Sequence, residues 1–142
     1  MHRQALIVGG GIGGLCAAIC LCLTGWDVQV FEQAPEITEI GAGLQISPNG
    51  VKILEHIGVM ERFESAVFDP EAIEIRMGVS GRPILYLPMK GVAAQRWGAR
   101  YLQVHRADLI TALSARLDAL QPGAMQTGCP VRGYAPCKDG AE

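Results

Sequence analysis

Three glycines near the start of the chain have the spacing of a dinucleotide-binding turn. Gly9, Gly11 and Gly14 form the pattern G-x-G-x-x-G. In such a turn the first glycine allows a tight bend, the second lets the backbone approach a pyrophosphate, and the third allows a helix to pack closely on a strand. The N-terminus of the following helix presents unpaired N–H groups and a partial positive charge to the phosphates. The spacing therefore predicts a pyrophosphate site.

Glu32 supplies the second part of this pattern. It lies eighteen residues after Gly14, at the end of a predicted strand. A carboxylate at that point accepts hydrogen bonds from ribose hydroxyls and repels a 2′-phosphate. NAD and FAD share the adenosine-pyrophosphate half of the molecule, so these residues do not distinguish them. The alternative is a glycine-rich turn followed by an ordinary surface glutamate.

The elements that would position these residues form a βαβ unit. Residues 5–23 carry no charge, and such a run could indicate a signal peptide or a membrane span. The glycines in its middle argue against one continuous helix, because each costs roughly 1 kcal/mol relative to alanine in a helix interior. The run divides better into a strand at 4–8, a glycine turn, and a helix at 12–24 that ends at Gly25. Residues 27–32 then have the composition of a second strand.

Further elements follow this unit. Ser47 and Pro48 indicate a helix start after the glycine-bearing loop GAGLQISPN, and Gly58 would end that helix at about residue 57. Asp108 opens another predicted helix, whose leucine stripe is Leu109, Leu113, Leu117 and Leu120. The other predicted elements are an antiparallel hairpin of 72–77 and 84–87 around a turn at 78–83, and a strand at 101–105.

The end of the chain predicts a strand without a partner. Residues 129–137 could form the strand, and residues 138–140 have the composition of a hairpin turn. Only two residues follow that turn. We therefore expect that this sequence stops inside a larger fold, and the alternative is a short disordered tail.

Composition and charge narrow the class of protein. The 142 residues allow one domain, and 49% hydrophobic with 18% charged residues predicts a packed core rather than disorder. A net charge of −2 gives no case for a nucleic-acid partner or an acidic membrane. The charge is uneven, because residues 76–106 hold six bases and no acid. That segment could face an anionic cofactor or an aromatic carboxylate, or form a solvated hairpin.

The cysteines indicate a reducing compartment. Five is an odd number, and the sequence has no CxxC pair, so a secreted disulfide framework is not favoured and we expect a cytoplasmic protein. Cys16 and Cys20 would share a helix face, but without a neighbouring histidine or carboxylate we interpret them as small core residues. The three scattered histidines predict no metal site.

Three ordered motifs resemble a known family. They are GGGIGGLCAAICL, FEQAPEITEIGAGLQISPNGVKIL and VHRADLITAL. In this order and spacing they resemble the N-terminal part of single-component FAD-dependent aromatic-ring monooxygenases of the salicylate-hydroxylase-like group. The resemblance covers essentially the whole chain, and residues 64–99 are its least specific part. It implies an incomplete, Rossmann-like three-layer α/β FAD-binding fold. In this fold the segment from about residue 70 to residue 100 contributes to an antiparallel substrate-domain sheet.

The resemblance also implies roles for individual residues. The glycine turn would hold the FAD pyrophosphate and Glu32 the adenosine ribose. Gln45 matches a position near the ribityl or flavin end, Arg106 an arginine that contacts FAD, and Val131 a strand residue whose backbone meets the adenine. An ion pair with Asp108 or a solvated strand end is the alternative for Arg106. The predicted cofactor-binding residues are Gly9, Gly11, Ile12, Gly13, Gly14, Glu32, Gln33, Gln45, Arg106 and Val131, and no catalytic residue can be assigned.

The implied activity is hydroxylation of a small aromatic acid, with NAD(P)H reducing FAD and O2 supplying the oxygen atom. The family's later motifs, an Asp-Gly with a flanking serine and a Gly-Asp-Ala, lie beyond residue 142. We therefore expect the parent protein to be the enzyme and this chain alone to be inactive. The alternatives are another FAD or nicotinamide oxidoreductase of the same fold, and a non-catalytic dinucleotide-binding fragment.

Overall fold

The computed structural model describes residues 3–36, 42–137 and 140–141. The chain divides into two compact units. The first unit comprises residues 1–39 and 113–142, and the second unit comprises residues 40–112. Helix α4 (Arg106–Leu120) contributes its first half to the second unit and its second half to the first.

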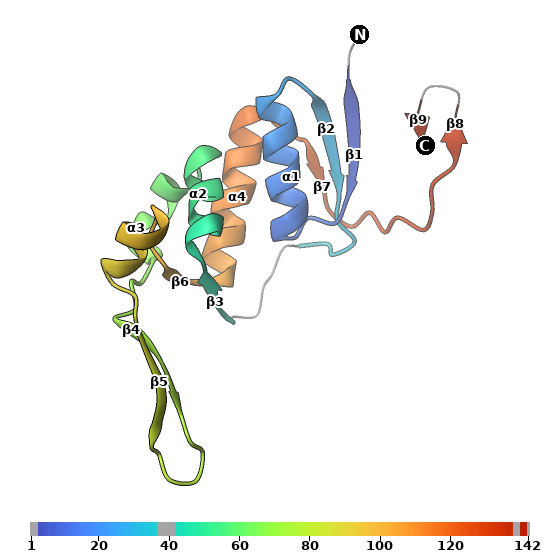
Figure 1. The fold of residues 1–142 in the computed structure, drawn as a ribbon. Helices are drawn as coiled ribbons and strands as arrows, with labels where there is room; N and C mark the ends of the chain where they lie inside the picture. Colours follow the sequence, from blue (N-terminus) through green and yellow to red (C-terminus); the bar gives the residue numbers. More distant parts are fainter. Residues whose placement is uncertain (1–2, 37–41, 138–139, 142) are drawn as a thin grey trace. The chain divides into compact units, whose positions relative to one another are not determined.

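The first unit is built on a parallel sheet. Its strands are β1 (Gln4–Val8), β2 (Asp27–Phe31) and β7 (Met125–Gln126), in the order β1-β2-β7. Helix α1 (Ile12–Leu23) connects β1 to β2, and Figure 1 shows it alongside these strands. The predicted βαβ unit is confirmed to within a residue at each element. A later strand was expected in this sheet, but its position at β7 was not predicted, because two residues are too few to show an alternating pattern.

The core of the first unit lies between β2 and the helices. Leu15 and Ile19 of α1 and Val28 and Val30 of β2 are fully buried. Leu113 and Leu117 of α4 are buried too, as the predicted leucine stripe requires, whereas Leu120 is half-buried. Burying each of these side chains stabilises the fold by about 1.5–3 kcal/mol.

The side chain of Gln121 makes the hydrogen bonds that a neighbouring strand would make to β2 at Val28. Strand β7 pairs only with Val30 and Phe31. At Val28 the side chain of Gln121 takes over, since its Oε1 accepts from the Val28 N–H at 3.0 Å and its Nε2 donates to the Val28 carbonyl at 2.9 Å. The same Nε2 donates to Asp27 Oδ1 at 2.6 Å. This one amide fixes the end of α4 to the sheet.

The second unit is made of antiparallel strand pairs and helices. Strand β3 (Gly43–Ile46) pairs with β6 (Leu102–His105), and β4 (Ala72–Arg76) pairs with β5 (Pro83–Pro88). These pairs confirm the predicted hairpin and the strand near 101–105. The helical elements are α2 (Pro48–His56), α3 (Val92–Trp97) and the 3-10 turns η1 (Met60–Arg62) and η2 (Glu64–Ala66). Helix α2 begins after Ser47 and ends before Gly58, as predicted.

Three expectations about local structure are wrong. The predicted loop GAGLQISPN contains β3, because the backbone of β6 supplies its hydrogen-bond partners. Helix α4 begins at Arg106, two residues before Asp108. Cys20 is exposed and Cys16 half-buried, so the interpretation of both as core residues fails for Cys20, which lies on the outer side of α1.

The predicted strand at 129–137 is also wrong. Residues 129–135 have no regular structure, and only β8 (Pro136–Cys137) is extended, paired with β9 (Gly140–Ala141). Pro130 and Pro136 lack the N–H group that a strand ladder needs, which limits pairing here. The expected absence of any partner is therefore wrong for β8, while residues 138–139 of the predicted turn lie outside the described residues.

Within the described residues, no helix is long and apolar enough to cross a membrane. The uncharged run at 5–23 is divided between β1, the glycine turn and α1.

Candidate functional site: a nucleotide cleft and a second pocket

The glycine turn lies between β1 and α1. Gly9 has φ +101°, a conformation that residues with a side chain rarely adopt, and its N–H donates to the Phe31 carbonyl at 2.8 Å. A Cβ on Gly14 would overlap the carbonyl oxygen of Gly9. The geometry thus requires glycine at both positions, for a turn at Gly9 and for a close approach at Gly14.

The start of α1 faces open space at Gly11. Gly11 is the N-cap, and a Cβ built on it would have no atom within 4 Å. The first N–H groups of any helix lack intrahelical acceptors, and no acidic residue occupies the first turn of α1. A helix end of this kind attracts an anion through its N–H groups and its partial positive charge. Ile12, Gly13 and Gly14 therefore lie where the sequence predicts phosphate contacts.

Glu32 is held in place by backbone donors. Its Oε1 accepts from the Ala34 N–H at 2.8 Å and its Oε2 from the Gly10 N–H at 2.7 Å. These hydrogen bonds from Ala34 and Gly10, with a smaller one from Gln33, lower the pKa of Glu32 below its ordinary value and keep it ionised. Each oxygen keeps a further lone pair for a ligand hydroxyl.

Gly10 belongs to the predicted glycine turn, but its contact with Glu32 was not predicted from the sequence. A Cβ there would lie 3.1 Å from the Cβ of Glu32, so Gly10 both donates to Glu32 and gives it room. The run of three consecutive glycines was the available signal, since G-x-G-x-x-G requires only the outer two of them.

A cleft of about 180 Å³ opens at the carboxyl ends of β1 and β2. Open α/β sheets bind ligands at this end of their strands. The Cys129 N–H donates to the Glu32 carbonyl at 2.9 Å, which holds the chain before Val131 against β2 although Val131 lies in no strand. Four of the predicted residues meet in the cleft, which is lined by Val8, Gly9, Phe31, Glu32, Gln33, Cys129 and Val131.

Gln45 and Arg106 form a separate set in the second unit. Gln45 lies on β3 opposite Gln103 of β6. The Arg106 N–H donates to the Ala42 carbonyl at 3.1 Å, which joins the start of α4 to the segment before β3. Arg106 is therefore a helix-start residue rather than a strand end. The structure groups the predicted residues into a cleft set in one unit and a strand-pair set in the other.

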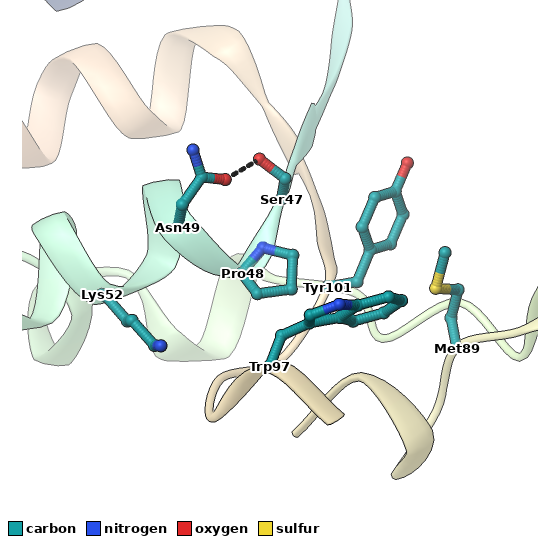
Figure 2. A pocket seen from close by; sticks show the side chains of 7 residues that line it. All are labelled: Ser47, Pro48, Asn49, Lys52, Met89, Trp97 and Tyr101. Atoms are coloured by element: carbon teal, nitrogen blue, oxygen red, sulfur yellow. Dashed lines mark hydrogen bonds between the residues drawn. The ribbon is translucent and has the colours of Figure 1, made fainter. Parts of the chain in front are cut away.

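The second unit also contains a larger pocket, of about 480 Å³. Figure 2 shows its side chains, with Lys52 at one side and Tyr101 and Met89 at the other. At the start of α2, the Ser47 hydroxyl donates to Asn49 Oδ1. The pocket is lined by Ser47, Pro48, Asn49, Lys52, Met89, Trp97 and Tyr101, none of which was predicted as a site residue.

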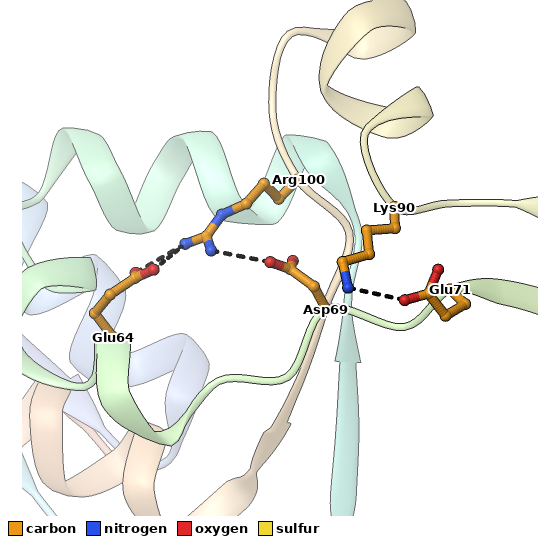
Figure 3. Close-up of polar contacts among 5 residues, drawn as sticks. All are labelled: Glu64, Asp69, Glu71, Lys90 and Arg100. Carbon is orange, nitrogen blue, oxygen red and sulfur yellow. Dashed lines mark hydrogen bonds and ion pairs between the residues drawn. The ribbon is translucent and has the colours of Figure 1, made fainter.

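Much of the basic segment is paired with the acidic segment that precedes it. The Arg100 guanidinium contacts Glu64 at 2.6 Å and Asp69 at 3.2 Å, and Lys90 contacts Glu71 at 2.8 Å (Figure 3). Partial burial lowers the pKa of Arg100, but Glu64 and Asp69 together outweigh it and raise that pKa above its ordinary value. Glu71 likewise raises the pKa of Lys90. The charges of these two residues are therefore already balanced within the second unit.

Comparison with known proteins identifies the family. A family model described as FAD binding domain matches residues 2–133. The chain belongs to this FAD binding domain family. The resemblance inferred from the motifs is thereby confirmed, and the described residues form part of the family's Rossmann-like α/β fold.

The similar curated proteins are aromatic-ring hydroxylases. The 3-amino-4-hydroxybenzoate 2-monooxygenase of Streptomyces cremeus is 39% identical over 113 residues, which are 80% of this chain and 29% of that protein. The 3-hydroxybenzoate 6-hydroxylase of Polaromonas naphthalenivorans is 37% identical over 123 residues, 87% of this chain and 29% of that protein. The chain thus spans under a third of the length of these relatives.

Solved structures with the same fold include a flavin complex. HpxO of Klebsiella pneumoniae, in complex with FAD and uric acid, is 30% identical with a TM-score of 0.80, over 98% of this chain and 34% of that chain. The tetrameric form of 2-methyl-3-hydroxypyridine-5-carboxylic acid oxygenase is 26% identical with a TM-score of 0.76. The match covers 98% of this chain and 36% of that chain. The glycine turn, the open helix start and the ionised Glu32 of the present chain fit the adenosine-pyrophosphate half of FAD.

Proposed function

We propose that this chain is the FAD-holding N-terminal part of a monooxygenase that hydroxylates a small aromatic acid with NAD(P)H and O2. The observation that carries the proposal is the cleft of the first unit, where the glycine turn and the backbone-anchored Glu32 meet. The names of the relatives, which are hydroxybenzoate hydroxylases, support the substrate class. The free thiols of all five cysteines support a reducing compartment such as the cytoplasm.

The first unit would bind the adenosine-pyrophosphate half of the cofactor. The N–H groups at the start of α1 donate to the pyrophosphate, and Gly11 leaves the space that it needs. Glu32 accepts from the ribose hydroxyls, with Gln33 beside it, and its negative charge excludes a 2′-phosphate. Val131 lines the same cleft, and its backbone would contact the adenine.

The second unit would bind the other half. Gln45 would lie near the ribityl or flavin end, and Arg106, whose guanidinium can form forked hydrogen bonds to phosphate, would contact the cofactor as well. FAD, when bound, supplies the redox chemistry of the reaction. The protein's part is to position the cofactor and to exclude water from the reacting ring.

The hairpin supports the proposed domain arrangement, in which residues about 70–100 contribute to a substrate-domain sheet. Strands β4 and β5 expose apolar side chains, among them Ile75, Ile84 and Leu85, at 45–61% of their surface. Exposed apolar faces of this kind are typical of a sheet that continues into further structure. Because the chain spans under a third of its relatives, we propose that these 142 residues alone bind dinucleotide weakly and do not hydroxylate.

FAD titration of the purified chain tests the binding site. We expect weak, saturable quenching of flavin fluorescence, at least tenfold weaker for Gly11→Val, whose side chain enters the space for the pyrophosphate. A Cβ at this position has no protein atom within 4 Å, so we attribute the loss to the blocked ligand space rather than to misfolding. Gly78→Val is the matched control, because a Cβ there also has no neighbour and Gly78 lies on the hairpin turn. Equal FAD affinity for Gly11→Val and the wild-type chain would contradict the site.

A full-length version tests the activity. We expect it to purify with stoichiometric yellow flavin and to oxidise NAD(P)H faster when a small aromatic acid is added. Turnover of a nicotinamide substrate without any flavin would favour the nicotinamide-only alternative. Aromatic-dependent NAD(P)H oxidation by residues 1–142 alone would show that the chain is sufficient, against our proposal.

A further inference from the structure

The pocket of the second unit has the size of a small-molecule site. Its volume of about 480 Å³ falls within the range of ligand pockets, roughly 300–1,000 Å³. Its lining combines two elements, the start of α2 and the segment from β5 through α3 to β6. It contains none of the residues predicted for FAD.

Flat apolar side chains form most of its walls. Trp97 and Tyr101 contribute aromatic rings, and Pro48 and Met89 add apolar surface beside them (Figure 2). Trp97 is 38% exposed, so part of its side chain remains accessible to a ligand. Such walls favour a planar ring, which can stack on an aromatic face.

The charge of the pocket is positive. Lys52 lines it, and no acidic residue does. Within the described part of the chain Lys52 has no carboxylate partner, unlike Lys90 and Arg100 of the same unit. The Arg96 guanidinium does not line the pocket, but it lies over the ring of Trp97, which does, at 5.3 Å from the ring centroid. An anionic group on the ligand would therefore gain an attraction that a neutral group lacks.

We propose that this pocket binds a small aromatic carboxylate, with the ring against Trp97 and Tyr101 and the carboxylate at Lys52. The choice of an aromatic acid as the ligand rests on the proposed function. The lining of the pocket is the reason for expecting a planar, negatively charged ligand. Gln45 and Ser47 are two residues apart in extended backbone and so share a face. The pocket thus adjoins the residue proposed for the flavin end, and Lys52 becomes a specificity-determining residue for the substrate's acid group.

Titration of the full 142-residue chain, labelled with nitrogen-15, tests the site. Its two tryptophans, Trp26 and Trp97, give two indole N–H signals, which Trp26→Phe assigns. The probes are benzoate, the neutral benzamide of the same shape, and acetate, which has no ring. We expect benzoate to shift the Trp97 signal saturably, benzamide to bind at least fivefold more weakly, and acetate to cause no shift. Equal affinities for benzoate and benzamide would overturn the proposal.

Two lysine variants separate the pocket charge from general charge. Lys52→Met keeps the aliphatic stem of the side chain but removes the charge. It should weaken benzoate binding about tenfold, to an affinity like that of benzamide. Lys90→Met removes a lysine of the same unit that pairs with Glu71 outside the pocket, and should leave benzoate affinity unchanged. Unchanged binding by Lys52→Met, or equal losses in both variants, would contradict a specific carboxylate site.

FAD titrations of the same samples distinguish the two proposals. Benzoate binding without FAD binding would support the proposed carboxylate site and contradict the proposed function. FAD binding without a benzoate shift at Trp97 would retain the proposed function and overturn the pocket.

Discussion

The two units build their sites from different parts of the residues. In the first unit the site is formed mainly by backbone groups. The N–H groups of Gly10 and Ala34 donate to Glu32, and the start of α1 presents further N–H groups. In the second unit the pocket and the ion pairs are made of side chains, such as Trp97, Lys52 and Arg100. Added atoms should therefore damage the first unit, whereas removed or shortened side chains should damage the second.

The largest effect is expected where an added atom meets backbone. Gly14→Ala places a Cβ on the Gly9 carbonyl oxygen, and we expect a loss of about 3 kcal/mol in unfolding free energy, as for severe overpacking. Gly13→Ala is the matched control, because its Cβ has no neighbour within 4 Å and alanine favours a helix by about 1 kcal/mol. Urea denaturation measures both variants. Similar stabilities for the two variants would contradict the expectation that an atom added at a close backbone approach damages the first unit.

Gln121 is an exception in the first unit, because its side chain makes structural hydrogen bonds to the backbone of β2. A variant at this position therefore tests the comparison between the two units. Gln121→Leu leaves the Val28 N–H and carbonyl without their partners, and we expect a loss of about 2 kcal/mol. Gln95→Leu, at an exposed position of α3, should be nearly neutral. Hydrogen exchange provides the local readout, because the Val28 amide should exchange faster in the first variant only. Unchanged protection of that amide would refute the substitute-strand role.

The charge of Glu32 should give the first unit a pH dependence. Its pKa is lowered in the folded state, so its contribution to stability is present above the unfolded pKa of about 4.3 and is lost as pH falls through the lower folded value. Glu32→Gln should cost about 1 kcal/mol at pH 7, because one backbone donor loses its acceptor. The difference in melting temperature from the wild-type chain should shrink below about pH 4. A difference independent of pH would contradict this assignment.

The smallest effect is expected for the ion pairs of the second unit. Arg100→Lys keeps the charge but loses the fork that joins Glu64 to Asp69, and it should cost less than about 1 kcal/mol because these groups are partly exposed. The loss should diminish in high salt. Arg82→Lys, at an exposed position, is the control. A loss larger than that of Gln121→Leu would reverse the expected order.

Local patterns predicted the elements whose residues interact with near neighbours in sequence. The glycine spacing, the uncharged strand before it and the composition of residues 27–32 were enough for β1, α1 and β2. Ser47, Pro48 and Gly58 marked the ends of α2 in the same way. Turn residues between two apolar runs predicted the β4–β5 hairpin. In each case the physical cause lies within a few residues, in backbone conformation, capping or the side-chain period.

The features that the sequence did not predict depend on distant partners. Strand β3 exists because β6 supplies its hydrogen bonds, and β7 because it extends the edge of β2. Val131 reaches the cleft without a strand, since Cys129 and Gly128 bond to the end of β2 and to Ala34. The pocket of the second unit unites residues from 47 to 101.

The sequence alone thus determined the nucleotide turn, its acidic partner and the family, because these depend on residue types at short, fixed spacings. The tertiary structure alone decided that Gly10 holds Glu32, that Gln121 completes the sheet and that Arg100 joins two carboxylates. Each of these contacts links residues 22 to 94 positions apart. Only the folded chain brings such residues within hydrogen-bond distance, since no local preference encodes their proximity.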